Sequence, residues 1–210
     1  MSESRPGARV GRRPATTVTR VCHVGLELFA RDGFDATSVE ATAEAAGISR
    51  RTFFRYFPSK NDVAWGDFDA QLAHMRAFLA GQPADEPLDR VLRRALLDFN
   101  TVPAEEAGYH RQRMALLLEV PALQAHSALK YVGWRRVVAE HVAARRGLRP
   151  GDHLPRTVGW VLLGVALAAY EQWLEDPASD LLELLADGAA VLGPALLTEP
   201  GAAPDGTARP

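Results

Sequence analysis

The sequence contains one cysteine, Cys22, so no disulfide can form within the chain. Cys22 lies among apolar residues at helical spacing, where we expect a small packing residue rather than a reactive thiol. The beginning of the chain is polar and basic, without the apolar stretch of a signal peptide. The longest apolar run, Val158 to Tyr170, is shorter than the roughly 20 residues a membrane-spanning helix needs. We therefore expect a cytoplasmic protein without a membrane partner.

Motifs of the common enzyme classes are missing as well. The sequence has no GxSxG, HExxH, Walker or Rossmann glycine pattern. The histidines never lie three or four residues apart, and with one cysteine this spacing does not favour a zinc site. We therefore predict no catalytic residue, metal or cofactor. The six histidines are His23, His74, His110, His126, His141 and His153.

The formal net charge is only −2, but the charge is unevenly distributed. Residues 1–60 hold ten Lys/Arg against six Asp/Glu, and the remaining residues hold fourteen against twenty. A basic N-terminal part on an acidic body suits a protein that places one end on phosphates, although many enzymes show an asymmetry of this size.

Helical periodicity, without strand alternation or an internal repeat, predicts an all-α fold of about nine helices. Prolines and glycines fall between the expected helices. We expect a basic arm over residues 1–15, in which Arg9, Arg12 and Arg13 either touch DNA or are simply solvated, and a loose tail over 199–210. The expected helices are 16–32, 38–45, 49–56, 60–80, 88–101, 105–119, 122–147, 154–176 and 179–197.

The most specific pattern is the segment TSVEATAEAAGISRRTFFRYFPSK, residues 37–60. Thr37 and Glu40 have the spacing of a capping box, which predicts a helix starting at Ser38. Gly47 stands where the chain must turn sharply, and Ser49 is a favourable N-cap for a second helix. Two short helices joined by a glycine turn are typical of a helix-turn-helix, whose second helix enters the DNA major groove.

The second helix divides into an inner and an outer face. Phe53 and Phe57 lie four residues apart and face inward, and Pro58 ends the helix. Ser59 and Asp62 then begin another helix, with Lys60 in its first turn, where a phosphate partner would explain the cation. We predict that Arg50, Arg51 and Thr52 read bases, while Arg55, Tyr56 and Lys60 hold phosphates.

The stretch resembles the DNA-binding domain of TetR-type transcriptional regulators, through ELFARDGFDATSV, AEAAGIS and TFFRYFPSK. More narrowly, FFRYFPSKNDVAWGDFDA, VPALQAHS and VGWVLLGVALAAYEQWL resemble regulators that accompany mycofactocin biosynthesis genes. The resemblance implies a helix-turn-helix domain over residues 16–62 and a ligand-binding and dimerisation domain over 63–198. The family usually has a tyrosine where Phe54 stands, and the tyrosine hydroxyl contacts a phosphate. Phe54 has no hydroxyl and cannot make that contact.

Aromatic residues concentrate in the expected helices 122–147 and 154–176, with Met114 in the helix before them. Most of them are expected in the core, yet several large aromatics between long helices also line ligand cavities. The candidate effector contacts are Trp134, Tyr131, Trp160, Tyr170 and Met114. Arg111, Arg113, Arg135 and Arg136 are either solvated or available to an anionic ligand.

Helices 154–176 and 179–197 are the expected dimer elements. Gly159, Gly164, Ala166 and Ala168 permit close helix approach, and an apolar stripe runs along the last helix, unless both surfaces pack only within one chain. That stripe comprises Leu181, Leu185, Ala189 and Leu192.

These observations predict a homodimeric transcriptional regulator that binds a palindromic operator and is released by an apolar or amphipathic effector. Long-chain acyl-coenzyme A is one candidate effector, implied by the resemblance. A lipophilic cation is another, for which Glu119 or Glu171 would have to face the pocket. The alternative function is a helical carrier or enzyme whose N-terminal helices are only scaffold.

Overall fold

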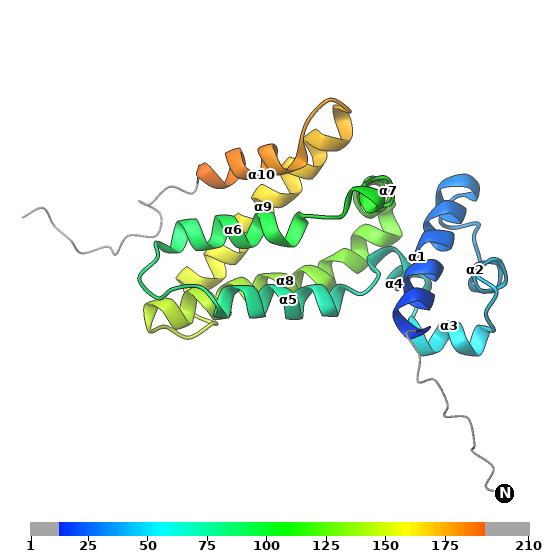
Figure 1. The fold of residues 1–210 in the computed structure, drawn as a ribbon, viewed down its shortest axis with the longest axis horizontal. Helices are drawn as coiled ribbons and strands as arrows, with labels where there is room; N and C mark the ends of the chain where they lie inside the picture. The colour runs from blue at the N-terminus through cyan, green and yellow to red at the C-terminus, as the bar shows by residue number, and fades with distance from the viewer. Residues whose placement is uncertain (1–12, 192–210) are drawn as a thin grey trace, which may run out of the picture. The chain divides into compact units, whose positions relative to one another are not determined.

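The computed structural model describes residues 13–191, with side chains from residue 18 onward. Within that range it contains ten α-helices, one short 3-10 helix and no strand, which confirms the all-α prediction with one helix more than expected (Figure 1). The chain forms two compact units. Over the described residues, the first comprises residues 13–68 with Glu105–His126, and the second Asp69–Ala104 with residues 127–191.

The first unit is built on α1 (Arg13–Asp32), which packs against α2 (Val39–Ala45), α4 (Lys60–Trp65) and α7 (Ala107–Glu119). The short helix α3 (Arg50–Tyr56) packs on α2, and the 3-10 helix η1 (Ala104–Glu106) leads into α7. Apolar side chains at helical spacing supply the core, which explains why these short helices are stable together. The largest fully buried side chains of this core are Leu26, Phe29, Phe53, Phe57, Leu117 and Leu123.

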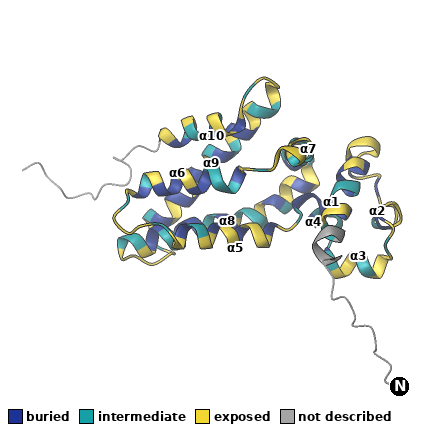
Figure 2. Ribbon diagram, in the orientation of Figure 1, coloured by how far each residue is buried: buried dark blue, intermediate teal, exposed yellow. Residues whose placement is uncertain are grey.

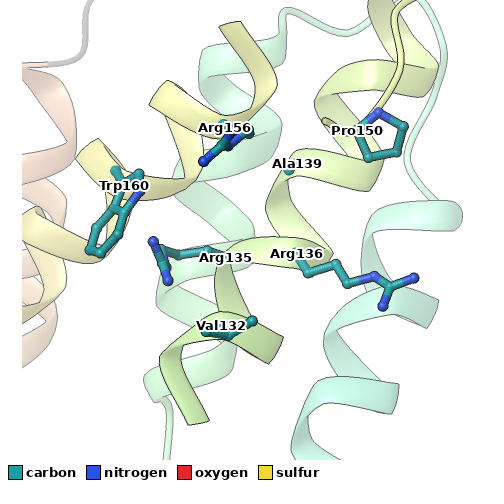
Figure 3. A pocket seen from close by; sticks show the side chains of 7 residues that line it. All are labelled: Val132, Arg135, Arg136, Ala139, Pro150, Arg156 and Trp160. Atoms are coloured by element: carbon teal, nitrogen blue, oxygen red, sulfur yellow. The ribbon is translucent and has the colours of Figure 1, made fainter. Parts of the chain in front are cut away.

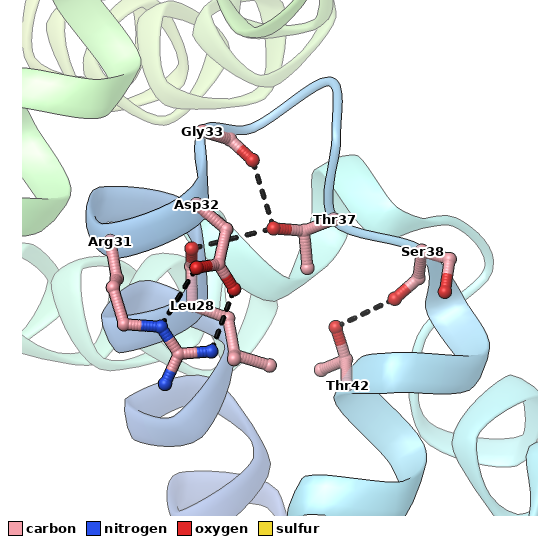
Figure 4. Close-up of polar contacts among 7 residues, drawn as sticks. All are labelled: Leu28, Arg31, Asp32, Gly33, Thr37, Ser38 and Thr42. Atoms are coloured by element: carbon pink, nitrogen blue, oxygen red, sulfur yellow. Dashed lines mark hydrogen bonds and ion pairs between the residues drawn. The ribbon is translucent and has the colours of Figure 1, made fainter.

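The start of α2 differs from the sequence prediction by one residue. Ser38, not Thr37, is the N-cap, and its side chain accepts a hydrogen bond from the Ala41 N–H. The Thr37 hydroxyl instead donates to the carbonyl oxygens of Gly33 and Leu28, at 2.8 and 3.4 Å (Figure 4). Thr37 is 3% exposed, so its hydroxyl satisfies the buried end of α1 rather than capping the next helix.

The single helix expected over residues 60–80 is wrong. The chain forms α4, breaks at Gly66, and resumes as α5 (Phe68–Ala80). Gly66 has φ of 60° and ψ of −143°, a conformation that only glycine adopts readily. The predicted start of α4 is confirmed, because Ser59 is its N-cap and the Asp62 carboxylate accepts from the Ser59 N–H at 3.1 Å.

The second unit contains the long helices α8 (Pro121–Arg146) and α9 (His153–Glu175), together with α6 (Leu88–Asn100) and α10 (Leu181–Ala190). Helix α8 belongs to this unit from Ser127 onward. Each of these helices has buried segments, which are dark blue in Figure 2. Leu92, Leu96, Leu162 and Leu185 are among the largest buried side chains of this core.

The stripe predicted on the last helix lies inside the chain. Leu181, Leu185 and Ala189 are 7%, 0% and 8% exposed, because α10 packs on α9 and α6. The prediction that these side chains form the dimer interface is therefore wrong. Leu192 and the rest of the helix expected to 197 lie outside the described residues, as do most of the predicted arm and the predicted tail.

Helix α9 is long enough and apolar enough to cross a bilayer, and no other helix among the described residues meets both conditions. One such helix is weak evidence for a membrane span, because a core helix has the same composition. In this fold α9 buries Leu162, Leu163 and Ala166 against the other helices.

Candidate nucleic-acid interface and effector region

The turn between α2 and α3 has the geometry of a helix-turn-helix. Gly47 has φ of 68° and its N–H donates to the Glu44 carbonyl, while the Ile48 N–H donates to the Ala43 carbonyl. Ser49 caps α3 by accepting from the Thr52 N–H at 3.1 Å. The residues chosen from the sequence for the turn and the cap therefore hold these positions.

The inner face of α3 anchors it in the first unit. Phe53 and Phe57 are 0% and 2% exposed, with ring centroids 5.5 Å apart. This anchoring leaves Arg50, Arg51 and Arg55 exposed on the outer side of the helix. A rigid helix that presents cations to solvent suits the phosphates and base edges of a duplex.

The two arginines at the start of α3 differ in their contacts. The Arg50 guanidinium lies 3.1 Å from the Glu40 carboxylate and over the Phe54 ring. Arg51 is exposed and forms no ion pair with any described residue. A base edge can therefore bind the Arg51 guanidinium without breaking an ion pair, whereas binding of Arg50 would disrupt its pair with Glu40.

The other residues of α3 that are predicted to contact DNA lie in its first turn, at Thr52, and in its last turn, at Arg55 and Tyr56. Arg55 stacks on the Tyr56 ring at 4.9 Å and donates to its hydroxyl at 3.0 Å, at the last turn of α3. Thr52 shares its hydroxyl with Ser49 at 2.9 Å. Both arrangements keep the side chains on the outer face, and their DNA contacts stay a prediction.

Lys60 has a structural role that the sequence did not indicate. Its ammonium donates to the carbonyl oxygens of Phe34 and Thr37, at 2.6 and 2.9 Å, and lies 4.2 Å from the Phe34 ring centroid. Lys60 thus ties the start of α4 to the loop that precedes α2. These contacts account for the cation without a phosphate, so its predicted phosphate contact is additional to a role in holding the loop.

The candidate effector residues do not form one cluster. Met114 is buried in the first unit, whereas the other four belong to the second. Trp134 is 3% exposed and packs edge-on against Phe99, and the Tyr170 hydroxyl donates to Asn100 at 2.6 Å in the core. Burial raises the pKa of the half-buried Tyr131. Met114, Trp134 and Tyr170 are core residues in this structure, whereas Tyr131 is half-buried. Contact of any of them with an effector stays a prediction.

Trp160 is different, because it is 56% exposed. It lines an open cavity of about 230 Å³ on the surface of α8 and α9 (Figure 3). The Arg135 guanidinium lies 3.3 Å from its ring centroid, and Arg136 and Arg156 line the same cavity. The sequence singled out Arg135 and Arg136 but not Arg156, and it did not place any of them beside Trp160, because the contact joins two helices.

The first unit also holds a polar cluster that the sequence did not indicate. The His23 ring stacks on Tyr109 at 3.7 Å and pairs with Glu106 at 2.9 Å, while Tyr109 donates to Glu27. Asp62 combines its capping role with a hydrogen bond to His126 at 3.2 Å. These contacts fix η1 and α7 to α1, and the second turn of α8 to α4. Sequence spacing carries no signal for them, since His23 and Glu106 are 83 residues apart.

Comparisons with known proteins agree with this geometry. A model of bacterial regulatory proteins of the tetR family matches residues 22–64, and a model of the MftR C-terminal domain matches residues 86–197. A protein of Mycobacterium tuberculosis, named as a mycofactocin biosynthesis transcriptional regulator, MftR, is 47% identical over 90% of this chain and 96% of its own. The regulator TcmR of Streptomyces glaucescens is 31% identical over 84% of this chain and 80% of its own.

Among solved structures, the fold is similar to FadR of Thermus thermophilus, a TetR-family repressor in complex with lauroyl-CoA. The TM-score is 0.58 at 25% identity, covering 90% of this chain and 100% of that one. These relatives and neighbours are transcriptional regulators, not enzymes.

Proposed function

This chain belongs to the TetR family of bacterial regulatory proteins, and from that premise we propose that it is a cytoplasmic, homodimeric repressor released from a palindromic operator by a small effector. The observation that supports DNA binding most directly is the outer face of α3. Its N-cap, glycine turn and buried phenylalanines orient the helix, and its arginines face solvent. Two such helices in a two-fold dimer would enter successive major grooves, roughly 34–36 Å apart.

We propose that Arg50, Arg51 and Thr52 read base edges and that Arg55, Tyr56 and Lys60 contact phosphates. Arginine pairs with guanine through two hydrogen bonds in the major groove, which gives the sequence preference. Phosphate contacts add affinity that is independent of sequence and falls with salt. The 47% sequence identity to MftR, over 90% of this chain, supports an operator beside mycofactocin biosynthesis genes.

We propose long-chain acyl-coenzyme A as the effector. FadR of Thermus thermophilus, with a similar fold, is in complex with lauroyl-CoA, and the second unit offers an apolar, aromatic interior around Trp134. A lipophilic cation is less well supported, because Glu119 and Glu171 are both exposed rather than directed into that interior. An effector releases DNA only through its different affinities for the two conformations of the regulator.

A gel shift tests both parts of this proposal. The purified chain is titrated onto DNA from upstream of its own gene and onto a scrambled duplex, at two salt concentrations, without and with palmitoyl-CoA. Retention of the upstream DNA alone, followed by release at micromolar palmitoyl-CoA, is expected. Specific retention without release would contradict the effector class, whereas equal binding of both duplexes would contradict the proposed function.

A further inference from the structure

Phe54 is an apolar side chain exposed on the outer face of α3. It is 45% exposed, and among the described residues of the first unit no other large apolar residue is exposed. The other exposed residues of α3 are three arginines, Arg50, Arg51 and Arg55. A single exposed ring is common on protein surfaces, but this one stands among the cations that we propose to face DNA.

Phe54 lies beside the two arginines at the start of α3. It follows Arg50 by four residues and Arg51 by three, and residues at these spacings are neighbours on a helix surface. The Arg50 guanidinium lies 5.5 Å from the Phe54 ring centroid. The ring therefore faces the same part of the major groove as the proposed base contacts of these arginines.

Two neighbours hold the Phe54 ring in its orientation. The ring packs edge-on against the buried Phe53, with ring centroids 5.5 Å apart and planes at 83°. The Arg50 guanidinium over the ring is itself paired with the Glu40 carboxylate at 3.1 Å. A side chain that is already ordered loses little conformational entropy on binding, so this ring is suited to a specific contact.

The DNA major groove offers one apolar group to such a ring, the 5-methyl group of thymine. A phenyl ring has no N–H, O–H or carbonyl group with which to bond a phosphate or a polar base edge. We propose that Phe54 reads one thymine in each half of the operator by packing against its 5-methyl group. This inference rests on the proposed function and adds an apolar base contact to the polar contacts of Arg50, Arg51 and Thr52.

Deoxyuridine tests the contact, because it removes the 5-methyl group of a thymine and leaves the base pairing intact. Each thymine of the upstream duplex that the gel shift selects is replaced in turn, together with its symmetry mate, and fluorescence anisotropy gives the dissociation constants. Replacement at one position per half-site should weaken binding about fifteenfold, which is about fourfold for each methyl group that loses its apolar contact.

Phe54→Ala should bind the thymine and the deoxyuridine duplexes equally, because the side chain that meets the methyl group is gone. Circular dichroism and thermal unfolding should show a folded chain, since the removed ring is nearly half exposed. Thr52→Ser is the matched control. It removes the only side-chain methyl group of α3 and keeps the hydroxyl that bonds Ser49, so it should leave the difference between the two duplexes unchanged.

Two results would overturn the thymine contact while leaving the proposed function intact. One is an upstream duplex in which no deoxyuridine weakens binding, and the other is a deoxyuridine effect that persists in folded Phe54→Ala. Loss of the effect in Thr52→Ser alone would also overturn it, because the methyl group would then be read by Thr52. Equal binding of the upstream and scrambled duplexes by the wild-type chain would instead contradict the proposed function.

Discussion

At the scale of single residues, Arg50 and Arg51 show what the sequence reveals and what it does not. Their place at the start of the recognition helix follows from Ser49 and Gly47, both of which act as the sequence predicts. The pairing of Arg50 with Glu40 joins two helices, so spacing along the chain could not indicate it. The same holds for Lys60, whose bonds to two loop carbonyls depend on how that loop folds.

Arg50 pairs with Glu40 and Arg51 has no ion pair, and this difference leads to a prediction for DNA binding. Arg51→Ala should weaken operator binding by about 1–3 kcal/mol and relax the preference among operator variants, because it removes a base contact. Arg50→Ala should also relax the preference, and because it frees the Glu40 carboxylate it should weaken binding of scrambled DNA as well. Fluorescence anisotropy on both duplexes measures the two effects. An Arg51→Ala variant whose loss is the same on both would show that Arg51 contacts only the backbone.

His110 provides a prediction for stability against pH. Burial, with a smaller contribution from the charge of Arg113, lowers the pKa of His110 from 6.5 to about 4. The unfolded chain therefore binds a proton at this residue at higher pH than the folded chain does. Stability is lost as the pH falls from about 6.5 to about 4, by roughly 3 kcal/mol in total, and the loss levels off below that range.

Urea unfolding at pH 7 and pH 4.5 measures this loss, with His110→Gln as the comparison. The variant should lose less stability than wild type between the two pH values, since it cannot take up that proton. Equal losses would show that other groups account for the acid sensitivity.

At the scale of elements, the sequence located most helix boundaries to within one or two residues, because prolines, glycines and N-cap side chains mark them. The break between α4 and α5 was missed because Gly66 stands alone in a helical pattern, and a single glycine is tolerated within a helix. Only its backbone conformation shows the break. The apolar stripe of α10 was recognised correctly as a stripe, but periodicity cannot tell whether it faces its own chain or a partner.

Gly66→Ala should therefore destabilise the protein by about 1–3 kcal/mol, because alanine is strained at that φ and ψ. Space is not the reason, since the added Cβ would lie 3.7 Å from the Cys22 sulfur, an ordinary contact. Gly108→Ala in α7 is the control: its Cβ meets nothing within 4 Å, and alanine favours the helix. Thermal unfolding should show opposite shifts for the two variants, and a Gly66→Ala variant as stable as wild type would contradict the strained break.

At the scale of the whole molecule, the helical periodicity predicts the all-α fold, and the helix-turn-helix pattern favours a DNA-binding regulator over a helical carrier or enzyme. The grouping of α7 with the N-terminal helices could not be read from the chain, because it depends on long-range contacts such as that of His23 with Tyr109. For the same reason, the candidate effector residues could be selected by type but not by position. What the sequence predicts best is the surface that α3 presents.

The measurement that tests this account most directly is a titration of the chain onto a fluorescent duplex from upstream of its own gene, at 150 mM salt, with scrambled DNA as competitor. We expect two protomers per site and an affinity at least about a thousandfold higher than for the scrambled sequence, which is the range of specific regulators. Equal affinity for both duplexes, with the dimer and the fold intact, would contradict the claim that this protein reads DNA sequence through α3.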